Sequence, residues 1–486
     1  MAAKMNNQFD NFDLFMTFYD IILVIFYLIF AYACAFSIRS LKSENLYYRK
    51  FLIKGLTAKF LGGISFSLVY TYFYTYGGDT MAYYSDAELI TQYFFRDPIT
   101  ALGFLIDPLS LEASRIQSAI GVLNFEYGGS EFPVVRVATF LNILAMNSYY
   151  STTLLFAAFS YFGMWHFYLV FAKRYPKING QLAIAIFFLP SVFFWGSGIS
   201  KDSIVIGFLG LMVYGIDRFL EPGIRRWKWL LLTLLCGYII FSIKAYIIMA
   251  LTPALVVWVI FSVKDRIRNN FIRIVLMPLL LILSIVGVIA SVEILGRYQS
   301  KYSFERFTST AQSMQSWHYV EGENTSENYG RGSSYSLGEY EPTLWGTIKM
   351  FPASVNVALF RPYFWEANNI AVFASAIESF VLFIFTLYIF LGLGVRRVFP
   401  LLWKDPFLMM AFTFAIFFAF AVGFTSYNFG ALVRYKIPAI PFYVASLLIL
   451  NHKVKEIKDR RKNTIRERKE KESHRFQPLK QNVQYN

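Results

Sequence analysis

Ionisable side chains stand where several long apolar stretches of this sequence end, a placement that could serve chemistry on a charged lipid. Ionisable groups near membrane depth are costly, so they line a cavity, form pairs or reach back to the surface. A carboxylate that faces several cations at one leaflet suits a phosphate-bearing lipid, because Arg and Lys can hold the phosphate while the carboxylate acts as a base. The residues expected to form such a site are Asp79 as the catalytic residue and, as substrate-binding residues, Tyr83, Tyr84, Lys201, Asp202, Arg361, Arg434 and Lys436.

Asp79 is the candidate catalytic carboxylate. The two glycines before it allow the backbone to leave an apolar segment sharply. As a base, Asp79 would accept the proton of an acceptor hydroxyl or amide while the lipid phosphate leaves, and Arg434, Lys436 or Arg361 would stabilise the developing charge. Alternatively, Asp79 would bind a divalent cation that stabilises the phosphate. The structural alternatives are a helix N-cap for Asp79 and an interfacial anchor for each cation.

Other ligand sets are not indicated by the sequence. Cys34 and Cys236 both fall inside predicted spans, so neither a disulfide framework nor a metal site is expected from them. The four histidines show no ligand spacing. Glu378, inside a predicted span, is expected to form a structural hydrogen bond or ion pair within the bundle rather than a proton relay.

The composition predicts an all-α, polytopic integral membrane protein. Of the 486 residues, 56% are hydrophobic and 16% charged, and several apolar runs reach the roughly 20 residues that span a bilayer. The net charge of +15 does not indicate a nucleic-acid partner, because much of it lies in residues 452–486, with twelve Lys or Arg against five Asp or Glu. We therefore predict one membrane domain, residues 1–451, and a basic cytoplasmic tail, residues 452–486.

Eleven spans are predicted, with the N-terminus outside and the C-terminus in the cytoplasm. Residues 76–149 carry three basic residues against eight acidic ones, which places them outside, whereas the short basic segments all fall on the cytoplasmic side. The segment between the first two spans is placed inside by Arg39, Lys42, Arg49, Lys50, Lys54 and Lys59. The spans lie at about residues 14–37, 56–75, 150–172, 181–197 and 203–220, in a hairpin turning near Lys244, and at about 271–295, 370–394, 406–424 and 429–450.

Two large outer loops, about residues 76–149 and 296–368, are expected to contain interfacial helices. Ala87 to Phe95 and Val134 to Met146 have helical apolar spacing, and the apolar but proline-broken stretch from Leu344 to Trp365 is expected to be interfacial or re-entrant. The polar stretch before it, Ser316 to Tyr340, is predicted to be a mobile loop or lid. The tail is expected to be disordered, the alternative being a solvated or membrane-surface helix.

Three motifs resemble the polytopic GT-C superfamily of glycosyltransferases. Gly78-Asp79-Thr80-Met81-Ala82-Tyr83-Tyr84 is similar to the acidic motif of the first large outer loop in that superfamily. Leu189-Pro190-Ser191 to Trp195, followed by Ser197-Gly198-Ile199-Ser200-Lys201-Asp202-Ser203, resembles the proline-containing span and charged outer turn of many bacterial members and of polysaccharide polymerases. Arg434-Tyr435-Lys436-Ile437-Pro438-Ala439-Ile440-Pro441 is similar to a late, proline-rich Arg-Tyr segment.

The resemblance implies a glycosyltransferase that uses a polyprenyl-linked sugar donor at the outer face of the bacterial inner membrane, in cell-surface glycan assembly. Asp79 would be the catalytic or metal-binding carboxylate, and Arg434 would contact the lipid phosphate. The expected partners are membrane lipids, the polyprenyl-linked sugar and proteins of a glycan-assembly complex.

This chain departs from the superfamily pattern, because its acidic loop follows the second span, its N-terminus is predicted outside and no outer soluble domain follows the spans. A Wzy-like or EpsG-like polysaccharide polymerase is therefore a second interpretation. An interpretation of another class is a non-catalytic transporter or flippase, or a membrane subunit of a surface-assembly or secretion complex. The sequence lacks the internal repeat expected of a transporter.

Overall fold

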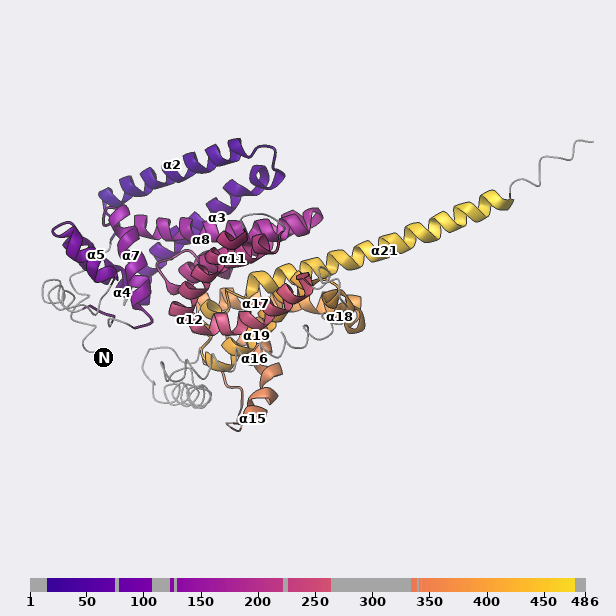
Figure 1. The fold of residues 1–486 in the computed structure, drawn as a ribbon. Helices are drawn as coiled ribbons and strands as arrows, with labels where there is room; N and C mark the ends of the chain where they lie inside the picture. Colours follow the sequence, from indigo (N-terminus) through magenta and orange to yellow (C-terminus); the bar gives the residue numbers. More distant parts are fainter. Residues whose placement is uncertain are drawn as a thin grey trace, which may run out of the picture.

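The computed structural model of the chain is a bundle of helices from which one long helix projects (Figure 1). It describes residues 15–74, 78–106, 123–125, 129–221, 226–263, 334–338, 341 and 343–476. Within these residues every regular element is a helix, and Ser334 and Asn428 form an isolated β-bridge.

The first half of the chain contributes α2 (Phe18–Leu41), α3 (Leu46–Tyr72), α4 (Gly78–Phe94), α5 (Pro98–Ile106), α7 (Phe132–Leu144), α8 (Tyr149–Arg174), η1 (Pro176–Ile178), α9 (Asn179–Phe187), α10 (Pro190–Trp195) and α11 (Lys201–Leu220). The second half contributes α12 (Arg226–Val263), α15 (Leu344–Lys349), α16 (Phe351–Phe360), η4 (Phe364–Glu366), α17 (Ile370–Leu393), α18 (Val395–Trp403), α19 (Pro406–Thr425), α20 (Phe429–Tyr435) and α21 (Ile440–Phe476).

Seven of the described helices are long and apolar enough to cross a membrane, namely α2, α3, α8, α11, α12, α17 and α19. An eighth is obtained if α20 and α21, which meet at a 65° bend, are taken as one broken span. The chain is thus an α-helical protein with the long apolar helices of a multi-pass membrane protein. The predicted number of eleven spans is not confirmed, and the span expected at residues 271–295 lies outside the described residues.

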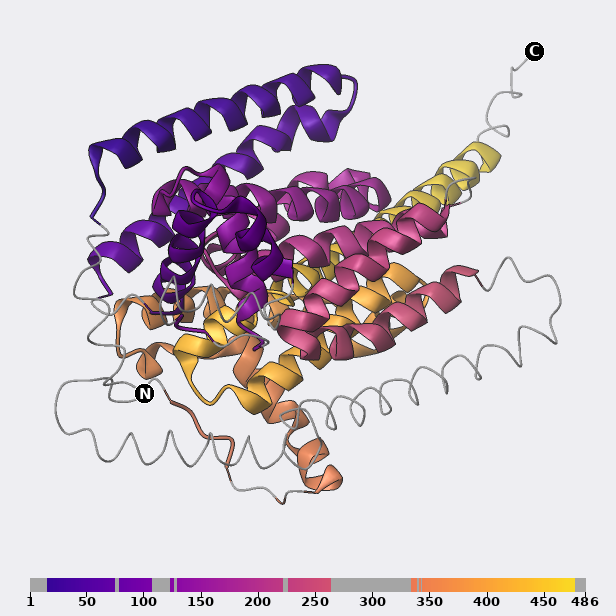
Figure 2. The same cartoon turned by 60° about the vertical axis from the view of Figure 1, so that its left-hand side comes forward.

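Helix α12 consists of two helical halves, because its chain reverses at Lys244, whose φ of −143° and ψ of 74° are not helical. Trp229, before the kink, contacts Tyr214 near the end of α11, whereas Lys244 contacts Asp202 at its start. Trp258, after the kink, lies again near the end of α11, because its ring lies beneath Arg174, which pairs with Asp217 near the end of that helix. The two halves of α12 therefore form the expected hairpin (Figure 2).

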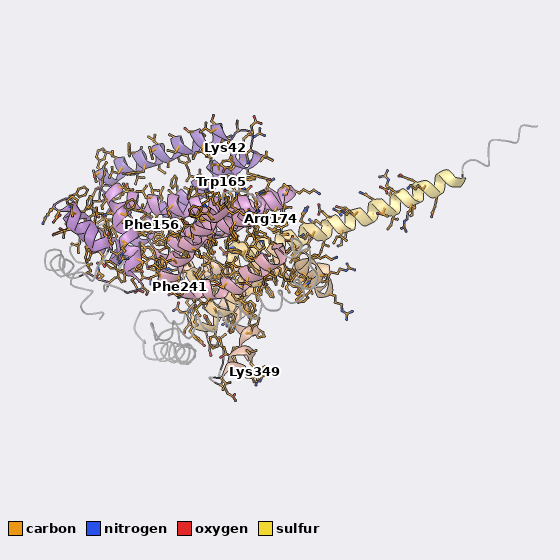
Figure 3. The ribbon with its side chains drawn as sticks, in the orientation of Figure 1. Lys42, Phe156, Trp165, Arg174, Phe241 and Lys349 are labelled. Atoms are coloured by element: carbon orange, nitrogen blue, oxygen red, sulfur yellow. The ribbon has the colours of Figure 1, made fainter. Side chains whose placement is uncertain are left out.

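Glycines bring α8 and α11 into close contact at the centre of the bundle. A Cβ atom added to Gly163 of α8 would lie 1.9 Å from the carbonyl oxygen of Gly207 in α11, and one added to Gly210 would lie 2.3 Å from that of Gly163. Small residues are favoured between membrane helices because they let the backbones approach. Phe156 and Trp165 of α8 are buried in this core (Figure 3).

Basic residues near the ends of α8 and η1 and within α21 lie together at one end of the bundle, which we call the basic end: Lys173, Arg174, Lys177 and Lys453. Tyr47, after the α2–α3 turn, donates a hydrogen bond to the Ala172 carbonyl oxygen at the end of α8. Lys453 of α21 lies 2.8 Å from Asp405 at the start of α19, and Tyr175 donates to the same carboxylate. Gathering of cations at one end is the distribution that the positive-inside rule describes, and the orientation of the termini across the membrane stays a prediction.

Three expectations from the sequence are wrong. Helix α3 begins at Leu46, so the loop before it is shorter than predicted, and Lys59 is buried inside the helix. The span expected at residues 181–197 is broken into α9 and α10, because Pro190 lacks an amide hydrogen and holds Leu189 extended. Residues 452–476 are helical rather than disordered, since they continue an already formed helix and include the ion pair Arg466–Glu470.

Candidate functional site

Four side chains from four helices form a continuous ion-pair network at the end of the bundle opposite the basic end. Arg434 places Nε 2.6 Å from Asp202 Oδ2 and Nη1 3.1 Å from Asp79 Oδ2. The second oxygen of Asp202, Oδ1, accepts a hydrogen bond from Lys244 Nζ. The order Asp79–Arg434–Asp202–Lys244 alternates in charge, so each buried charge has an opposite neighbour. We call these four residues the network.

Burial differs sharply along the network. The side chain of Asp202 is 0% exposed and that of Lys244 6%, whereas Arg434 is 17% and Asp79 61% exposed. The buried members are therefore a rigid support, and Asp79 is the member that is accessible to another molecule. Of the residues proposed from sequence, Asp79, Asp202 and Arg434 are thus in direct contact.

The local sequence explains how each member reaches this point. Asp202 lies in the first turn of α11, where Ser200 is the N-cap and accepts a hydrogen bond from the Ser203 amide. Arg434 lies in the last turn of α20, and Asp79 in the first turn of α4. Lys244 reaches the same place because α12 reverses there, and its ammonium group lies 4.9 Å from the centre of the Tyr435 ring.

Lys201 is adjacent to the network in sequence but pairs with another carboxylate. Its Nζ lies 2.5 Å from Glu131 Oε1, just before α7. Burial alone would raise the pKa of Glu131, but the hydrogen bond and charge of Lys201 outweigh burial and lower it. A second carboxylate, which the sequence did not single out, therefore forms an ion pair near the start of α11.

Tyr83 and Tyr84 are packing residues as well as neighbours of Asp79. Tyr83 is 1% exposed and stacks on Phe125 with ring centres 4.5 Å apart. Burial, and then the negative charge of Asp79, raise the pKa of the Tyr83 phenol. Tyr84 donates a hydrogen bond to the Asn147 carbonyl oxygen at 3.0 Å. Both rings therefore support α4 behind Asp79.

Asp86, about two turns after Asp79 in α4, fixes the segment that carries Phe125. Its carboxylate accepts hydrogen bonds from the Asn124 amide at 2.8 Å, the Asn124 side chain at 2.8 Å and the Phe125 amide at 3.1 Å. Burial raises the pKa of Asp86 to about 6, and these hydrogen bonds oppose the rise.

Arg361 and Lys436 lie away from the network. Arg361 forms a two-point ion pair with Glu366 and is surrounded by the rings of Tyr335, Tyr363 and Phe429, with centres 5.2–5.8 Å from its Cζ. The buried ammonium group of Lys436 donates a hydrogen bond to Ser379 at 3.0 Å and contacts the Arg361 carbonyl oxygen at 3.5 Å. The expected convergence of Asp79, Lys201, Arg361 and Arg434 is thus only partly present, in the pair Asp79–Arg434.

Lys244 is the network member that sequence reasoning used only as a turn marker. The available signal was a single lysine inside a long apolar run, since a charge at membrane depth needs a partner. Glu131 gave no comparable signal, because it is one of many acidic residues in its loop. Within the described part of the chain, no three His, Cys, Asp or Glu side chains are placed to hold a metal ion.

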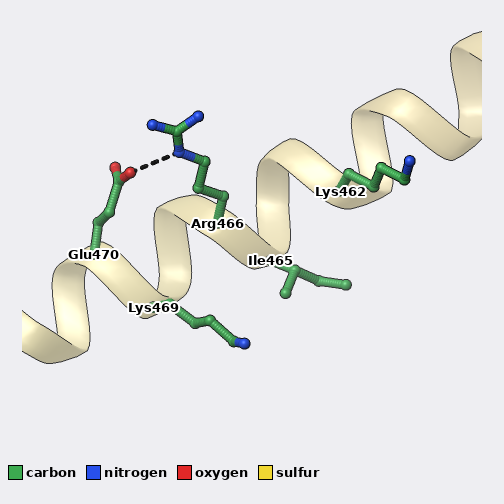
Figure 4. A pocket seen from close by; sticks show the side chains of 5 residues that line it. All are labelled: Lys462, Ile465, Arg466, Lys469 and Glu470. Carbon is green, nitrogen blue, oxygen red and sulfur yellow. Dashed lines mark hydrogen bonds and ion pairs between the residues drawn. The ribbon is translucent and has the colours of Figure 1, made fainter.

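A shallow surface on the projecting part of α21 is unrelated to the network. It is lined by residues of that one helix, Lys462, Ile465, Arg466, Lys469 and Glu470 (Figure 4). A surface formed by one helix alone encloses nothing, so it does not compete as a catalytic site.

Comparison of the chain with protein-family models, with curated proteins and with solved structures found no match. The fold and the network define an α-helical protein of multi-pass membrane type with a partly exposed ion-pair network at one end of its bundle.

Proposed function

We propose that this chain is a membrane glycosyltransferase that moves a sugar from a polyprenyl-linked donor to an acceptor. One observation carries the proposal: the exposed carboxylate of Asp79 is held against Arg434, which is itself anchored on the buried Asp202. Asp202, which is itself held by Lys244, fixes the guanidinium group of Arg434, so the remaining N–H groups of that guanidinium can serve a phosphate. A positioned base beside a phosphate-binding cation is the arrangement that transfer from a lipid phosphate requires.

In the proposed reaction, Asp79 takes the proton from the acceptor hydroxyl. The acceptor oxygen forms a bond to the anomeric carbon of the sugar while the bond from that carbon to the phosphate oxygen breaks. The phosphate leaves with the electron pair, and Arg434 stabilises its charge. Alternatively, Asp79 would hold a divalent cation, which would supply the same charge stabilisation. The reaction would take place at the outer face of a bacterial inner membrane, in cell-surface glycan assembly.

A polysaccharide polymerase would use the same chemistry on a longer acceptor. A non-catalytic membrane subunit is favoured by a different observation, the balance of charge in the network. Its two negative and two positive members compensate one another without a ligand. The network would then serve as a structural interlock, meaning a set of ion pairs that holds the helices together. The two classes differ in what the loss of Asp79 should do, because an interlock loses little from its most exposed member.

The decisive experiment replaces Asp79 by Asn in a strain that needs this chain for its extracellular glycan. We expect glycan synthesis to fall about 100-fold or more, as on removal of a general base, at unchanged protein level and melting temperature. Asp97→Asn is the matched control, because Asp97 caps the nearby α5 through Thr100 and is not a network member. Unchanged glycan in Asp79→Asn would refute the enzymatic proposal and leave the interlock.

A further inference from the structure

Helix α10 and the turn after it determine where Asp202 lies. The helix is only six residues long, follows the break at Leu189, and leads through residues 196–200 directly into α11. The whole turn is buried. Any shift of this segment would displace the carboxylate on which Arg434 is anchored.

One face of α3 forms the surface on which this segment lies. A Cβ atom added to Gly62 would meet the Phe193 carbonyl oxygen at 2.1 Å, and one added to Gly63 would approach that of Ser197 at 3.4 Å. The ring of Phe66 fills the space beside Gly198, where a Cβ atom would be 2.2 Å away. Positions 62, 63 and 66 share a helical face with position 59, which is one turn earlier.

Lys59 supplies the polar contact of that face. Its side chain is fully buried, and its Nζ donates hydrogen bonds to the Gly196 carbonyl oxygen at 2.7 Å and to Ser160 Oγ at 3.1 Å, with the Val192 carbonyl oxygen at 3.4 Å. Among the described residues no carboxylate pairs with it, so its ammonium group is held by neutral oxygen atoms of α8, of α10 and of Gly196, which follows α10. A buried charge with neutral partners is costly, and here its donors meet carbonyl groups at the end of α10.

The beginning of α10 is held by a carboxylate from another helix. Glu378 of α17 accepts hydrogen bonds from the Ser191 amide at 2.8 Å and from the Ser191 hydroxyl at 2.6 Å. This agrees with the structural hydrogen bond expected for Glu378. The short helix is therefore fixed at both ends by ionisable side chains, Glu378 at its start and Lys59 at its finish.

We propose that Lys59 is a positioning residue for the network: its ammonium group occupies a cation site made by the Gly196, Val192 and Ser160 oxygens and thereby fixes the turn that carries Asp202. Lys59 acts through Asp202 and has no contact with a substrate. The inference rests on the proposed function only in its last step, from the position of Asp202 to glycan synthesis.

The test uses the full-length protein in membranes, with Ser197→Cys as a reporter in the buried turn. Lys59→Met keeps an unbranched apolar side chain, one atom shorter, and removes the charge. We expect the thiol of Ser197→Cys to react with a maleimide at least about tenfold faster when Lys59→Met is also present than when Lys59 is retained, because the turn opens locally. Lys54→Met is the control, since Lys54 is exposed on the same helix.

A second variant separates loss of the cation from misfolding. Lys59→Ala leaves room for a small ammonium ion, so propylammonium should slow thiol labelling again and raise the melting temperature, whereas uncharged propanol should do neither. Labelling in Lys59→Met equal to that of the Lys54→Met control, or no response of Lys59→Ala to propylammonium, would overturn the proposal. If both thiol results hold while Asp79→Asn leaves the glycan unchanged, the positioning role stands and the enzymatic proposal fails.

Discussion

Arg434 contacts two carboxylates at once, Asp202 through Nε and Asp79 through Nη1, at 2.6 and 3.1 Å. A guanidinium presents several N–H groups in one plane, so it can bridge groups from different helices with fixed geometry. The two carboxylates come from α11 and α4, far apart in the chain, and differ in exposure from 0% to 61%. The arginine thus joins the buried interior of the bundle to a group at its surface.

Replacing Arg434 by Lys should separate the contact with Asp202 from the contact with Asp79. A single ammonium group can remain with Asp202 but cannot also hold Asp79 in the same geometry. We expect a modest fall in melting temperature and a glycan yield as low as that of Asp79→Asn. Thermal unfolding and a glycan assay on the same preparations would measure both. Wild-type glycan levels in Arg434→Lys would mean that charge alone, without the bridge, is sufficient.

Removing the charge of Asp202 alone should destabilise the fold more than removing the charges of Asp202 and Lys244 together. Asp202→Asn leaves Lys244 and Arg434 with an uncompensated buried charge, which we expect to lower the free energy of unfolding by about 3–5 kcal/mol. Adding Lys244→Met to Asp202→Asn should recover part of this loss, because one unpaired cation is then absent. Denaturant titration in detergent micelles gives the comparison. A double variant that loses as much as the sum of its two single variants would contradict a direct pairing.

The contact of α8 with α11 predicts a sharp difference between two glycines. Gly163→Ala places a Cβ atom against the Gly207 backbone, so the helices must separate, and we expect a large fall in melting temperature and folded yield. Gly237→Ala is the control, because its nearest atom beyond its own helix is the flexible Met212 Cε at 3.6 Å. Equal stability of the two alanine variants would show that α8 and α11 are not so closely packed.

Asp86 should give the fold a measurable pH dependence. Its pKa is raised from 3.8 to about 6, so between these values the folded chain binds a proton that the unfolded chain releases. Stability from this group is therefore complete below about pH 4 and is lost as pH rises through about 6, a change on the order of 3 kcal/mol. The difference in unfolding free energy between wild type and Asp86→Asn, measured from pH 4 to 7, should follow this curve. A pH-independent difference would contradict the raised pKa.

Truncation tests whether the projecting helix belongs to the folding unit. Contacts of α21 with other elements include Lys453 with Asp405 and Glu456 with Lys177. A chain that ends after Arg461 keeps both, so its melting temperature should match that of the full chain. A chain that ends after Asn451 lacks both partners and should melt at a lower temperature. Equal melting of the two truncated chains would show that residues 452–461, including these two pairs, contribute nothing to stability.

Sequence patterns predicted the helical class and most long helices because apolar length is a local property. They also predicted the reversal at Lys244 and three members of the network, since ionisable residues at the ends of apolar runs are few. The break before Pro190 follows from proline chemistry, whereas the apolar length of residues 181–197 predicts one unbroken span. The burial of Lys59 could not be read locally, since its partners lie more than 100 residues away in α8 and beyond α9.

Helix α21 has a mechanical consequence. It runs without interruption for 37 residues, about 55 Å, from inside the bundle to the outer end of the projecting part. Its first residue, Ile440, comes only six positions after Arg434. A continuous helix is stiff, so a force applied at its C-terminal end would be transmitted to the short turn that joins it to α20.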